Sequence, residues 1–212
     1  MLPTIAPYPL PVRSELPDNR VAWRADPSRA VLLVHDMQNY FLAAFGDAGS
    51  PLPAAVDNIA ALRKHCAELA VPVIFTGQPP GQSAAQRGLL QEFWGSGLPD
   101  DPHAAAITTA LEPGPGDLRL TKARYSAFVG TDLAELLGER DQLILTGVYA
   151  HIGVLATAVD AFMRDVRPFV VADAVADFGP EEHERAMRQV AQRCGSVTTT
   201  AALVDDLDAG AR

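Results

Sequence analysis

The chain has 212 residues, which is enough for one well-packed domain and few for two. Its 26 acidic and 17 basic side chains give a net charge of −9, with no long block of either sign. We therefore expect no nucleic-acid partner, because neutralising a phosphate backbone requires clustered Lys and Arg. We also expect no membrane partner, because no run approaches the ~20 apolar residues that span a bilayer.

Apolar runs alternate with helical patterns after a proline-rich start. We expect residues 1–25 to form an extended N-terminal arm and residues 26–212 to form one domain. Six runs are typical of strands buried on both faces of a sheet, at 30–37, 71–78, 118–128, 142–148, 167–175 and 196–203. Helical stripes lie between them, at 56–69, 152–166 and 180–195. This order predicts an α/β three-layer sandwich with a mostly parallel six-stranded sheet.

A long insertion follows the second predicted strand. Residues 79–117 are rich in Gly, Pro and Ser around a single tryptophan, Trp94. Insertions after the carboxyl end of a strand often cover a binding site, and we expect this one to do so.

The two cysteines, Cys66 and Cys194, each fall within a helical apolar pattern. The N-terminus lacks the apolar core of a signal peptide, so we expect a cytoplasmic protein. In that reducing compartment we expect two free thiols rather than a disulfide bond.

Polar residues follow the ends of the first four predicted strands. Ligands of open parallel sheets bind outside the carboxyl ends of the strands, so we expect these residues to share one rim. They are His35, Asp36, Gln78, Lys122, Tyr149 and His151. An acid, an amide, a cation and a phenol are thereby predicted to converge.

Lys122 is one of only two lysines among the 17 basic residues, which indicates a need for a compact charge on a flexible stem. The alternative is a chance lysine at an exposed strand end. Asp36 could likewise only cap the turn that follows it. Its context, His-Asp-Met-Gln before Tyr40 and Phe41, favours a functional role. His35 and His151 fit hydrogen-bonded structural positions better than catalytic ones, and Asp173 and Asp177 fit turns or helix caps.

Six strings carry a family resemblance in their order and spacing. They are VLLVHDMQNYF, TGQP, QRGLLQEFWGSG, TKARYSAF, GVYAHIGV and PFVVADAVADF. Together they resemble the isochorismatase-like hydrolases from about Leu10 to about Leu207. The similarity is greatest to the siderophore isochorismatases and to the 2-amino-2-deoxyisochorismate hydrolases of phenazine biosynthesis. It implies an isochorismatase-like fold, a homodimer and a small anionic substrate derived from chorismate.

Two departures from the wider family bear on mechanism. We place the family's nucleophilic cysteine at Val154, and valine cannot attack a carbonyl. The metal-binding histidines of nicotinamidases are replaced by Gln78-Pro79-Pro80, and none of the five histidines is paired at a ligand spacing. We therefore expect no metal ion and no organic cofactor.

A vinyl ether can be hydrolysed without a nucleophile or a metal, because protonation of its terminal carbon starts the reaction. We expect Asp36 to be the acid and Lys122 its partner, acting on an enolpyruvyl ether. A lysine beside it would lower the pKa of Asp36, and burial would raise it. The resemblance implies substrate binding by Gln78, Arg87 and Tyr149, with the Gly153 backbone near the enolpyruvyl group. Phe41 and Trp94 are candidates for apolar walls.

The sequence leaves the substrate open between isochorismate and 2-amino-2-deoxyisochorismate. Two other functions compete with vinyl ether hydrolysis. One is an amidase or nicotinamidase of the same fold, which the missing cysteine and metal ligands disfavour. The other is a non-catalytic binding protein, which the full set of polar residues disfavours. The chain ends at Arg212, soon after the last predicted strand, so we expect no carrier-protein domain.

Overall fold

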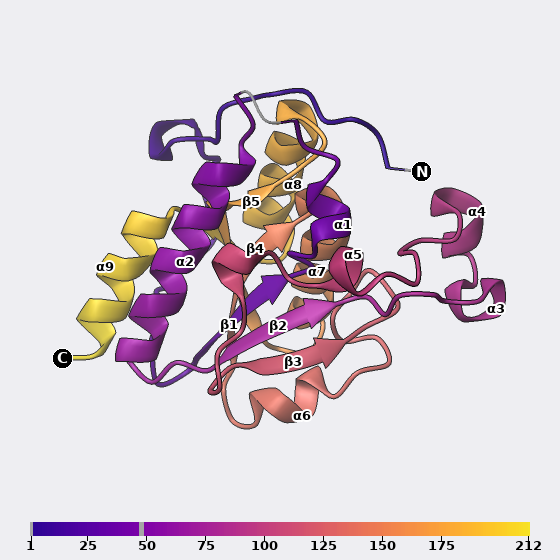
Figure 1. Ribbon diagram of the computed structural model, residues 1–212. Coiled ribbons are helices and arrows are strands. Elements are labelled where there is room, and N and C mark those ends of the chain that lie inside the picture. The colour runs from indigo at the N-terminus through magenta and orange to yellow at the C-terminus, as the bar shows by residue number, and fades with distance from the viewer. Residues whose placement is uncertain (1, 47–48) are drawn as a thin grey trace.

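A six-stranded sheet forms the centre of the computed structural model, which describes residues 2–46 and 49–212. The strand order is β3-β2-β1-β4-β5-β6, and every neighbouring pair is parallel (Figure 1). The strands are β1 (Ala30–His35), β2 (Val73–Gly77), β3 (Leu118–Thr121), β4 (Gln142–Val148), β5 (Arg167–Ala176) and β6 (Ser196–Thr198). The predicted sheet is confirmed, and it is parallel throughout.

Helices cover both faces of this sheet. One face carries α2 (Leu52–Glu68) and α9 (Thr200–Gly210), and the other carries α6 (Leu133–Leu137), α7 (Leu155–Phe162) and α8 (Pro180–Arg193) (Figure 1). Side chains of β1 alternate between the two hydrophobic layers: Leu32 and Val34 join one layer, and Val31 and Leu33 join the other. A strand buried on both faces requires this alternation. The predicted three-layer α/β sandwich is confirmed.

Two of the predicted strands are less than half their predicted length in the structure. The run at 118–128 ends at Thr121, because its neighbour β2 ends at Gly77, the residue that pairs with Thr121. The run at 196–203 ends at Thr198 and is followed by α9. The Thr199 hydroxyl caps this helix, and Asp173 Oδ1 accepts the Thr200 N–H at 2.7 Å. Threonine favours strands and also helix N-caps, so the pattern did not separate the two.

The N-terminal segment packs along the domain. It has little regular structure apart from a 3₁₀ turn, η1 (Arg13–Glu15). Ile5 and Tyr8 are buried in the hydrophobic core, and the Tyr8 hydroxyl accepts a hydrogen bond from the Asp177 N–H at 2.7 Å. The Asn19 amide bonds both the N–H and the C=O of Val197 in the edge strand β6. The segment therefore contributes to the core and covers part of an open sheet edge.

The insertion after β2 projects from the body of the molecule. Its first part, residues 79–106, is called the lid below and contains α3 (Ala84–Arg87), α4 (Leu90–Trp94) and α5 (Pro102–Ala105). A 3₁₀ turn, η2 (Thr109–Leu111), follows it, and α1 (Asn39–Leu42) lies beside α5. In Figure 1, α3 and α4 stand out on the side of the carboxyl ends of the strands. The lid is thus placed where a ligand site of this sheet is expected.

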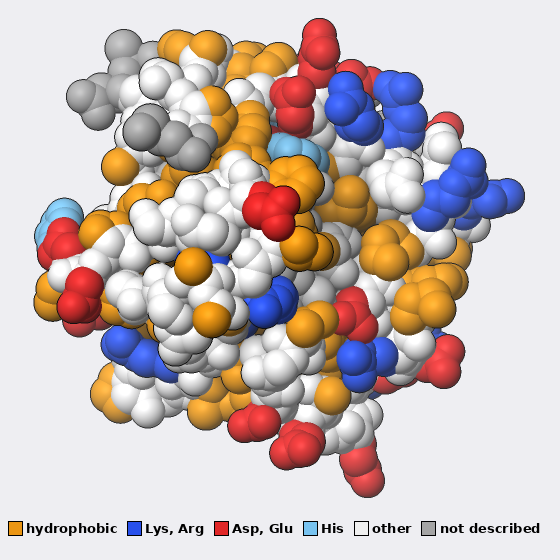
Figure 2. Space-filling model, turned by 90° about the vertical axis from the view of Figure 1, so that its right-hand side faces the viewer, with side chains coloured by type: hydrophobic (Ala, Val, Ile, Leu, Met, Phe, Trp, Pro, Cys, Tyr) orange, Lys and Arg blue, Asp and Glu red, His pale blue; other side chains and the backbone are white. Residues whose placement is uncertain are grey.

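Charged side chains are mixed on the surface over the lid. Figure 2 shows Lys and Arg side chains in separate groups on this face, with acidic and hydrophobic side chains between them. Within residues 2–46 and 49–212, no helix is long and apolar enough to cross a membrane.

Candidate active site

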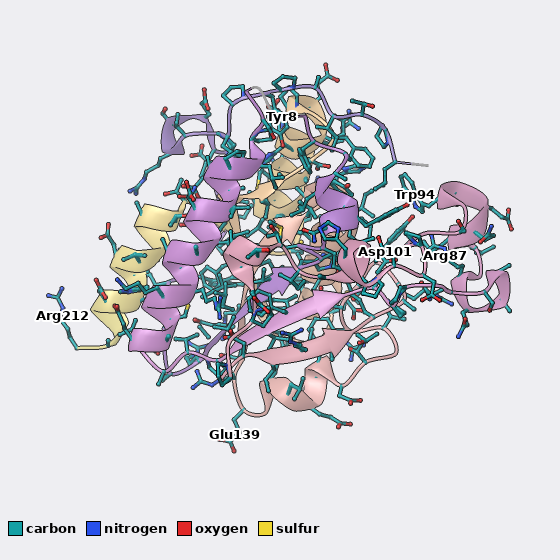
Figure 3. All side chains as sticks on the ribbon, in the orientation of Figure 1. Tyr8, Arg87, Trp94, Asp101, Glu139 and Arg212 are labelled. Carbon is teal, nitrogen blue, oxygen red and sulfur yellow. The ribbon has the colours of Figure 1, made fainter. Side chains whose placement is uncertain are left out.

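The polar residues at the strand ends meet in one cavity. It lies between β1 and β4, the two central strands of the sheet. Later strands are added outward from these two in both directions, and ligands of such sheets bind at this point. The lid covers the cavity. Eight of the nine predicted site residues line it: Asp36, Phe41, Gln78, Arg87, Trp94, Lys122, Tyr149 and Gly153. In Figure 3, Arg87 and Trp94 come from the lid on the side that faces the sheet.

Asp36 and Lys122 form a buried ion pair at the centre of the cavity wall. Lys122 Nζ lies 2.7 Å from Asp36 Oδ2 and also donates to the Arg124 main-chain oxygen at 3.0 Å. The two residues are 4% and 2% exposed. Asp36 has a φ of +51°, a left-handed conformation that non-glycine residues rarely adopt. Lys122 is therefore not a chance lysine at an exposed strand end, and the backbone at Asp36 is held in an uncommon shape.

Two opposing effects act on the Asp36 carboxyl. Burial raises its pKa, but the neighbouring His35 and Lys122 and the hydrogen bonds from Lys122 and Thr76 outweigh burial and hold the pKa below its ordinary value. We attribute the lowering to Lys122 above all, because His35 is itself uncharged at neutral pH. Burial lowers the pKa of His35 to about 4 against the pull of the Asp36 carboxylate, so His35 is uncharged at neutral pH. Without a ligand, Asp36 is therefore ionised at neutral pH.

Both ring nitrogens of His35 lie near main-chain oxygens. Its Nδ1 lies 2.9 Å from the Val148 oxygen, and its Nε2 lies 3.3 Å from the Tyr125 oxygen. The uncharged ring has a single N–H and donates to one of these oxygens at a time. These contacts tie β1 to the end of β4 and to the loop after β3. The prediction of a hydrogen-bonded structural histidine is confirmed, although the ring also lines the cavity.

The segment after β4 places Gly153, and not Val154, at the cavity. Val154 is fully buried among the side chains that pack beneath α7, so the structure does not bring this predicted site residue to the cavity. The segment forms a π-helical turn, η3 (Ala150–Val154), in which the Val154 N–H donates to the Tyr149 oxygen five residues back. Such a turn changes the helical phase, and Gly153 rather than Val154 lines the cavity.

A side chain at Gly153 has no room. A Cβ there would lie 3.1 Å from Nδ1 and 2.8 Å from Nε2 of His35, and closer still to Cε1. Because the His35 ring is 1% exposed and hydrogen-bonded to the main chain, it cannot move aside freely. Neither cysteine lines this cavity, nor does any serine or threonine in the described part of the chain. Among the described residues, the cavity lining therefore offers no cysteine, serine or threonine as a nucleophile.

Arg87 is a buried cation without an acidic partner. It is 3% exposed, and its guanidinium donates to the Gly95 oxygen at 2.9 Å and to Gln78 Oε1 at 3.4 Å. Among the described residues it forms no salt bridge. Burial lowers the pKa of Arg87, yet an arginine stays charged at neutral pH. With Lys122 balanced by Asp36, the cavity carries one excess positive charge.

Aromatic rings form the remaining walls. Phe41 and Tyr149 meet edge to face at 6.1 Å, and the Tyr149 hydroxyl donates to the Phe41 main-chain oxygen at 2.6 Å. This bond commits the hydroxyl to the protein, so Tyr149 presents its ring to the cavity. Trp94 Nε1 donates to the Tyr125 hydroxyl at 2.6 Å and so fastens the lid to the loop after β3.

The closed cavity is smaller than a ring substrate. Its free volume is about 50 Å³, room for a few water molecules, whereas small-molecule sites measure roughly 300–1,000 Å³. A ring compound needs more space than this, so we expect the lid to move when one binds. The Trp94–Tyr125 hydrogen bond and the bond from Arg124 to the Gln86 oxygen (3.1 Å) are contacts between lid and loop that would then separate.

Several cavity residues were not singled out from the sequence. They are Leu2, Tyr40, Leu90, Gly97, Leu98, Tyr125, Val148 and Ile152. Tyr125 carried a signal, because TKARYSAF is one of the strings that resemble the family. Tyr40, Leu90, Gly97, Val148 and Ile152 also lie in such strings, whereas Leu2 and Leu98 lie outside them.

Asp177 caps the start of η3 from the end of β5. Its carboxylate accepts the His151 N–H at 2.7 Å and the Phe178 N–H at 2.8 Å, and it bonds His151 Nδ1 at 2.5 Å. The predicted capping role of Asp177 and structural role of His151 are confirmed. In residues 2–46 and 49–212, no group of three or more His, Cys, Asp or Glu side chains could hold a metal ion.

Comparisons with known proteins agree with this architecture. Residues 30–202 match the family model described as Isochorismatase domain. The chain is 50% identical over 206 residues to phenazine biosynthesis protein PhzD of Pseudomonas fluorescens, covering 94% of this chain and 96% of that protein. It is 49% identical over 208 residues to an isochorismatase of Bacillus subtilis, covering 97% of this chain and 67% of that protein. The crystal structure of a cysteine hydrolase from Pseudomonas syringae superposes with a TM-score of 0.82 at 22% sequence identity. The superposition covers 92% of this chain and 98% of that chain, and it supports the fold. The chain belongs to the isochorismatase family of hydrolases.

Proposed function

We propose that this site hydrolyses the enolpyruvyl vinyl ether of a small dicarboxylate derived from chorismate. The substrate is isochorismate or 2-amino-2-deoxyisochorismate. The products are pyruvate and 2,3-dihydro-2,3-dihydroxybenzoate or trans-2,3-dihydro-3-hydroxyanthranilate, respectively. The observation that carries the proposal is the buried Asp36–Lys122 pair beside Arg87, a cation with no acidic partner in the described part of the chain. Such a site offers a proton donor and binds a carboxylate.

The reaction begins with a proton transfer to carbon. Asp36 gives its proton to the terminal methylene carbon of the enolpyruvyl group, which leaves an oxocarbenium ion. A water molecule adds to the ether carbon and returns a proton to Asp36. The resulting hemiketal breaks its bond to the ring oxygen, which takes up the hydroxyl proton, and pyruvate and the ring alcohol leave. No bond to the protein forms, which agrees with the lack of room for a side chain at Gly153.

Asp36 must gain a proton before this step, although it is ionised without ligand. A substrate with two carboxylates brings negative charge beside Lys122 and Arg87 in a closed cavity. That charge opposes the lysine's effect and raises the pKa of Asp36. The substrate thereby prepares the acid that acts on it. Gln78 and the Gly153 backbone line the same space and would orient the two ends of the substrate.

Isotope incorporation tests the reaction. The enzyme is incubated with each substrate in D₂O or in H₂¹⁸O, and pyruvate is trapped at once as lactate by lactate dehydrogenase. We expect one deuterium in the methyl group and no ¹⁸O in the ring product, because water attacks the side-chain carbon. Labelled oxygen in the ring alcohol, or no pyruvate from either substrate, would contradict the proposal. The relative kcat/KM values identify the preferred substrate.

Alkylation of the cysteines should leave activity intact. Cys66 and Cys194 are buried free thiols outside the cavity, which confirms the prediction of free thiols. Burial raises the pKa of Cys66 to about 12 and that of Cys194 to about 11, so little thiolate exists at neutral pH. Pyruvate release is measured before and after iodoacetamide, with labelled thiols counted by mass spectrometry. Strong inactivation that maps to either cysteine would argue for a thiol mechanism.

A further inference from the structure

Thr76 makes two hydrogen bonds to the same aspartate. It lies in β2, next to β1 in the sheet, and is 1% exposed. Its hydroxyl donates to Asp36 Oδ1 at 2.7 Å and accepts the Asp36 main-chain N–H at 3.1 Å. Because the N–H occupies a lone pair of the hydroxyl, the hydroxyl proton is directed at the carboxylate. Thr76 does not line the cavity, so this contact lies behind Asp36 as seen from a ligand.

The two oxygens of Asp36 therefore differ. Oδ1 accepts from Thr76 within the sheet, whereas Oδ2 lies 2.7 Å from Lys122 Nζ and 3.7 Å from His35 Nδ1. Oδ2 is the oxygen on the side of Lys122, which lines the cavity. A proton on Oδ1 would compete with the hydroxyl proton that Thr76 already directs there. A proton on Oδ2 meets no such conflict once Lys122 turns toward a substrate carboxylate.

We propose that Thr76 is a positioning residue that keeps Oδ1 of Asp36 in a structural hydrogen bond and leaves Oδ2 to carry the transferred proton. The inference rests on the proposed function for the identity of the acid. Beyond that function, it states which carboxyl oxygen of Asp36 carries the proton and that Thr76 determines this. Thr76 also fixes the rotation of the carboxyl plane, because one hydroxyl holds both the side chain and the main chain of Asp36.

Replacing Thr76 with valine keeps the volume and removes the hydroxyl. The lost bond favoured the ionised carboxylate, so the pKa of Asp36 rises in Thr76→Val, by ~1 unit. The other charged or titratable groups that face Asp36 are unchanged: His35 from β1, Lys122 after β3, Tyr149 after β4 and Arg87 in the lid. The limb of the kcat–pH profile that falls as Asp36 loses its proton therefore moves to higher pH. The plateau drops roughly 10-fold, because the acid is less well oriented.

The matched control is Thr146→Val. Thr146 is also fully buried in a central strand, and its hydroxyl donates to the Leu33 main-chain oxygen at 3.1 Å. This variant loses a comparable hydrogen bond but should keep the wild-type pH profile. Thr76→Ser keeps the hydroxyl and should restore the profile and most of the plateau. If Thr76→Val shows the wild-type profile, or if Thr146→Val shifts it equally, the inference is overturned.

A measurement without turnover separates this inference from the proposed function. The Asp36 carboxyl carbon is titrated by ¹³C NMR in the ligand-free protein, with its signal assigned by its loss in Asp36→Asn. The pKa should rise in Thr76→Val and stay unchanged in Thr146→Val, whichever substrate the enzyme uses. A raised pKa without pyruvate release would support the role of Thr76 and contradict the proposed reaction. An unchanged pKa would reject the role of Thr76 even in an active hydrolase.

Discussion

Asp36→Asn is expected to lower kcat by ~10²–10⁴-fold, the usual contribution of a general acid. The amide keeps the size of the side chain, and its oxygen can still accept the Thr76 hydroxyl. It cannot give a proton to carbon, however, so the first step of the reaction stalls. Pyruvate release under saturating substrate measures the loss. Asp206→Asn is the matched control, because Asp206 pairs with the exposed Arg24 at 2.8 Å, outside the cavity lining, and should keep full activity.

The same variant leaves Lys122 buried without its carboxylate. Removal of one partner of a buried ion pair typically costs about 3–5 kcal/mol, so the unfolding temperature should fall. The double variant Asp36→Asn/Lys122→Met removes the stranded charge and should regain much of that stability without regaining activity. This pair of results separates a chemical loss from a folding loss. Asp36→Asn that retains more than about a tenth of the wild-type kcat would exclude Asp36 as the general acid.

Arg87→Met is expected to raise KM and lower kcat/KM at least about 30-fold, which corresponds to about 2 kcal/mol for a lost buried contact to a carboxylate. Methionine fills a similar volume without the charge. Because Arg87 has no acidic partner among the described residues, its removal strands no carboxylate. The unfolding temperature should fall only by the effect of the lost hydrogen bonds to Gly95 and Gln78, as in the control below. Steady-state kinetics and thermal unfolding of the same preparation measure both effects.

Arg140→Met serves as the control for Arg87→Met. Arg140 also donates to main-chain oxygens, those of Pro27 and Ala30, but at the opposite end of β1. Its replacement should lower stability and leave KM unchanged. An unchanged KM in Arg87→Met, or an equal rise in both variants, would rule out Arg87 as the carboxylate-binding residue.

Much of the site could be predicted because parallel strands bring their carboxyl ends to one edge. That rule predicts from the sequence alone that Asp36, Gln78, Lys122 and Tyr149 lie close together. Arg87 could be assigned only by family resemblance, because the lid has no periodicity that ties its residues to the sheet. The rule also says nothing of ionisation, which depends on the distance between Asp36 and Lys122.

Other features lay beyond the sequence for identifiable physical reasons. Thr76 matches an ordinary strand residue, and only the register of β1 against β2 shows that its hydroxyl meets Asp36. Family resemblance placed Val154 at the site, and the π-helical turn in which Val154 is buried cannot be recognised from apolar spacing. The helix that begins at Thr200 was hidden by threonines that suit either a strand or a helix cap.

The contact between His35 and Gly153 also limits how this enzyme could change. A cysteine introduced at position 153 would collide with the buried His35 ring, which is hydrogen-bonded to the main chain. A smaller residue introduced first at position 35 would remove that hydrogen bond and loosen the backbone beside Asp36. Each single step is thus unfavourable, and only the two together would yield a thiol beside the acid and the lysine. Passage between non-covalent and covalent hydrolysis within this scaffold therefore crosses an evolutionary barrier of two mutually dependent substitutions.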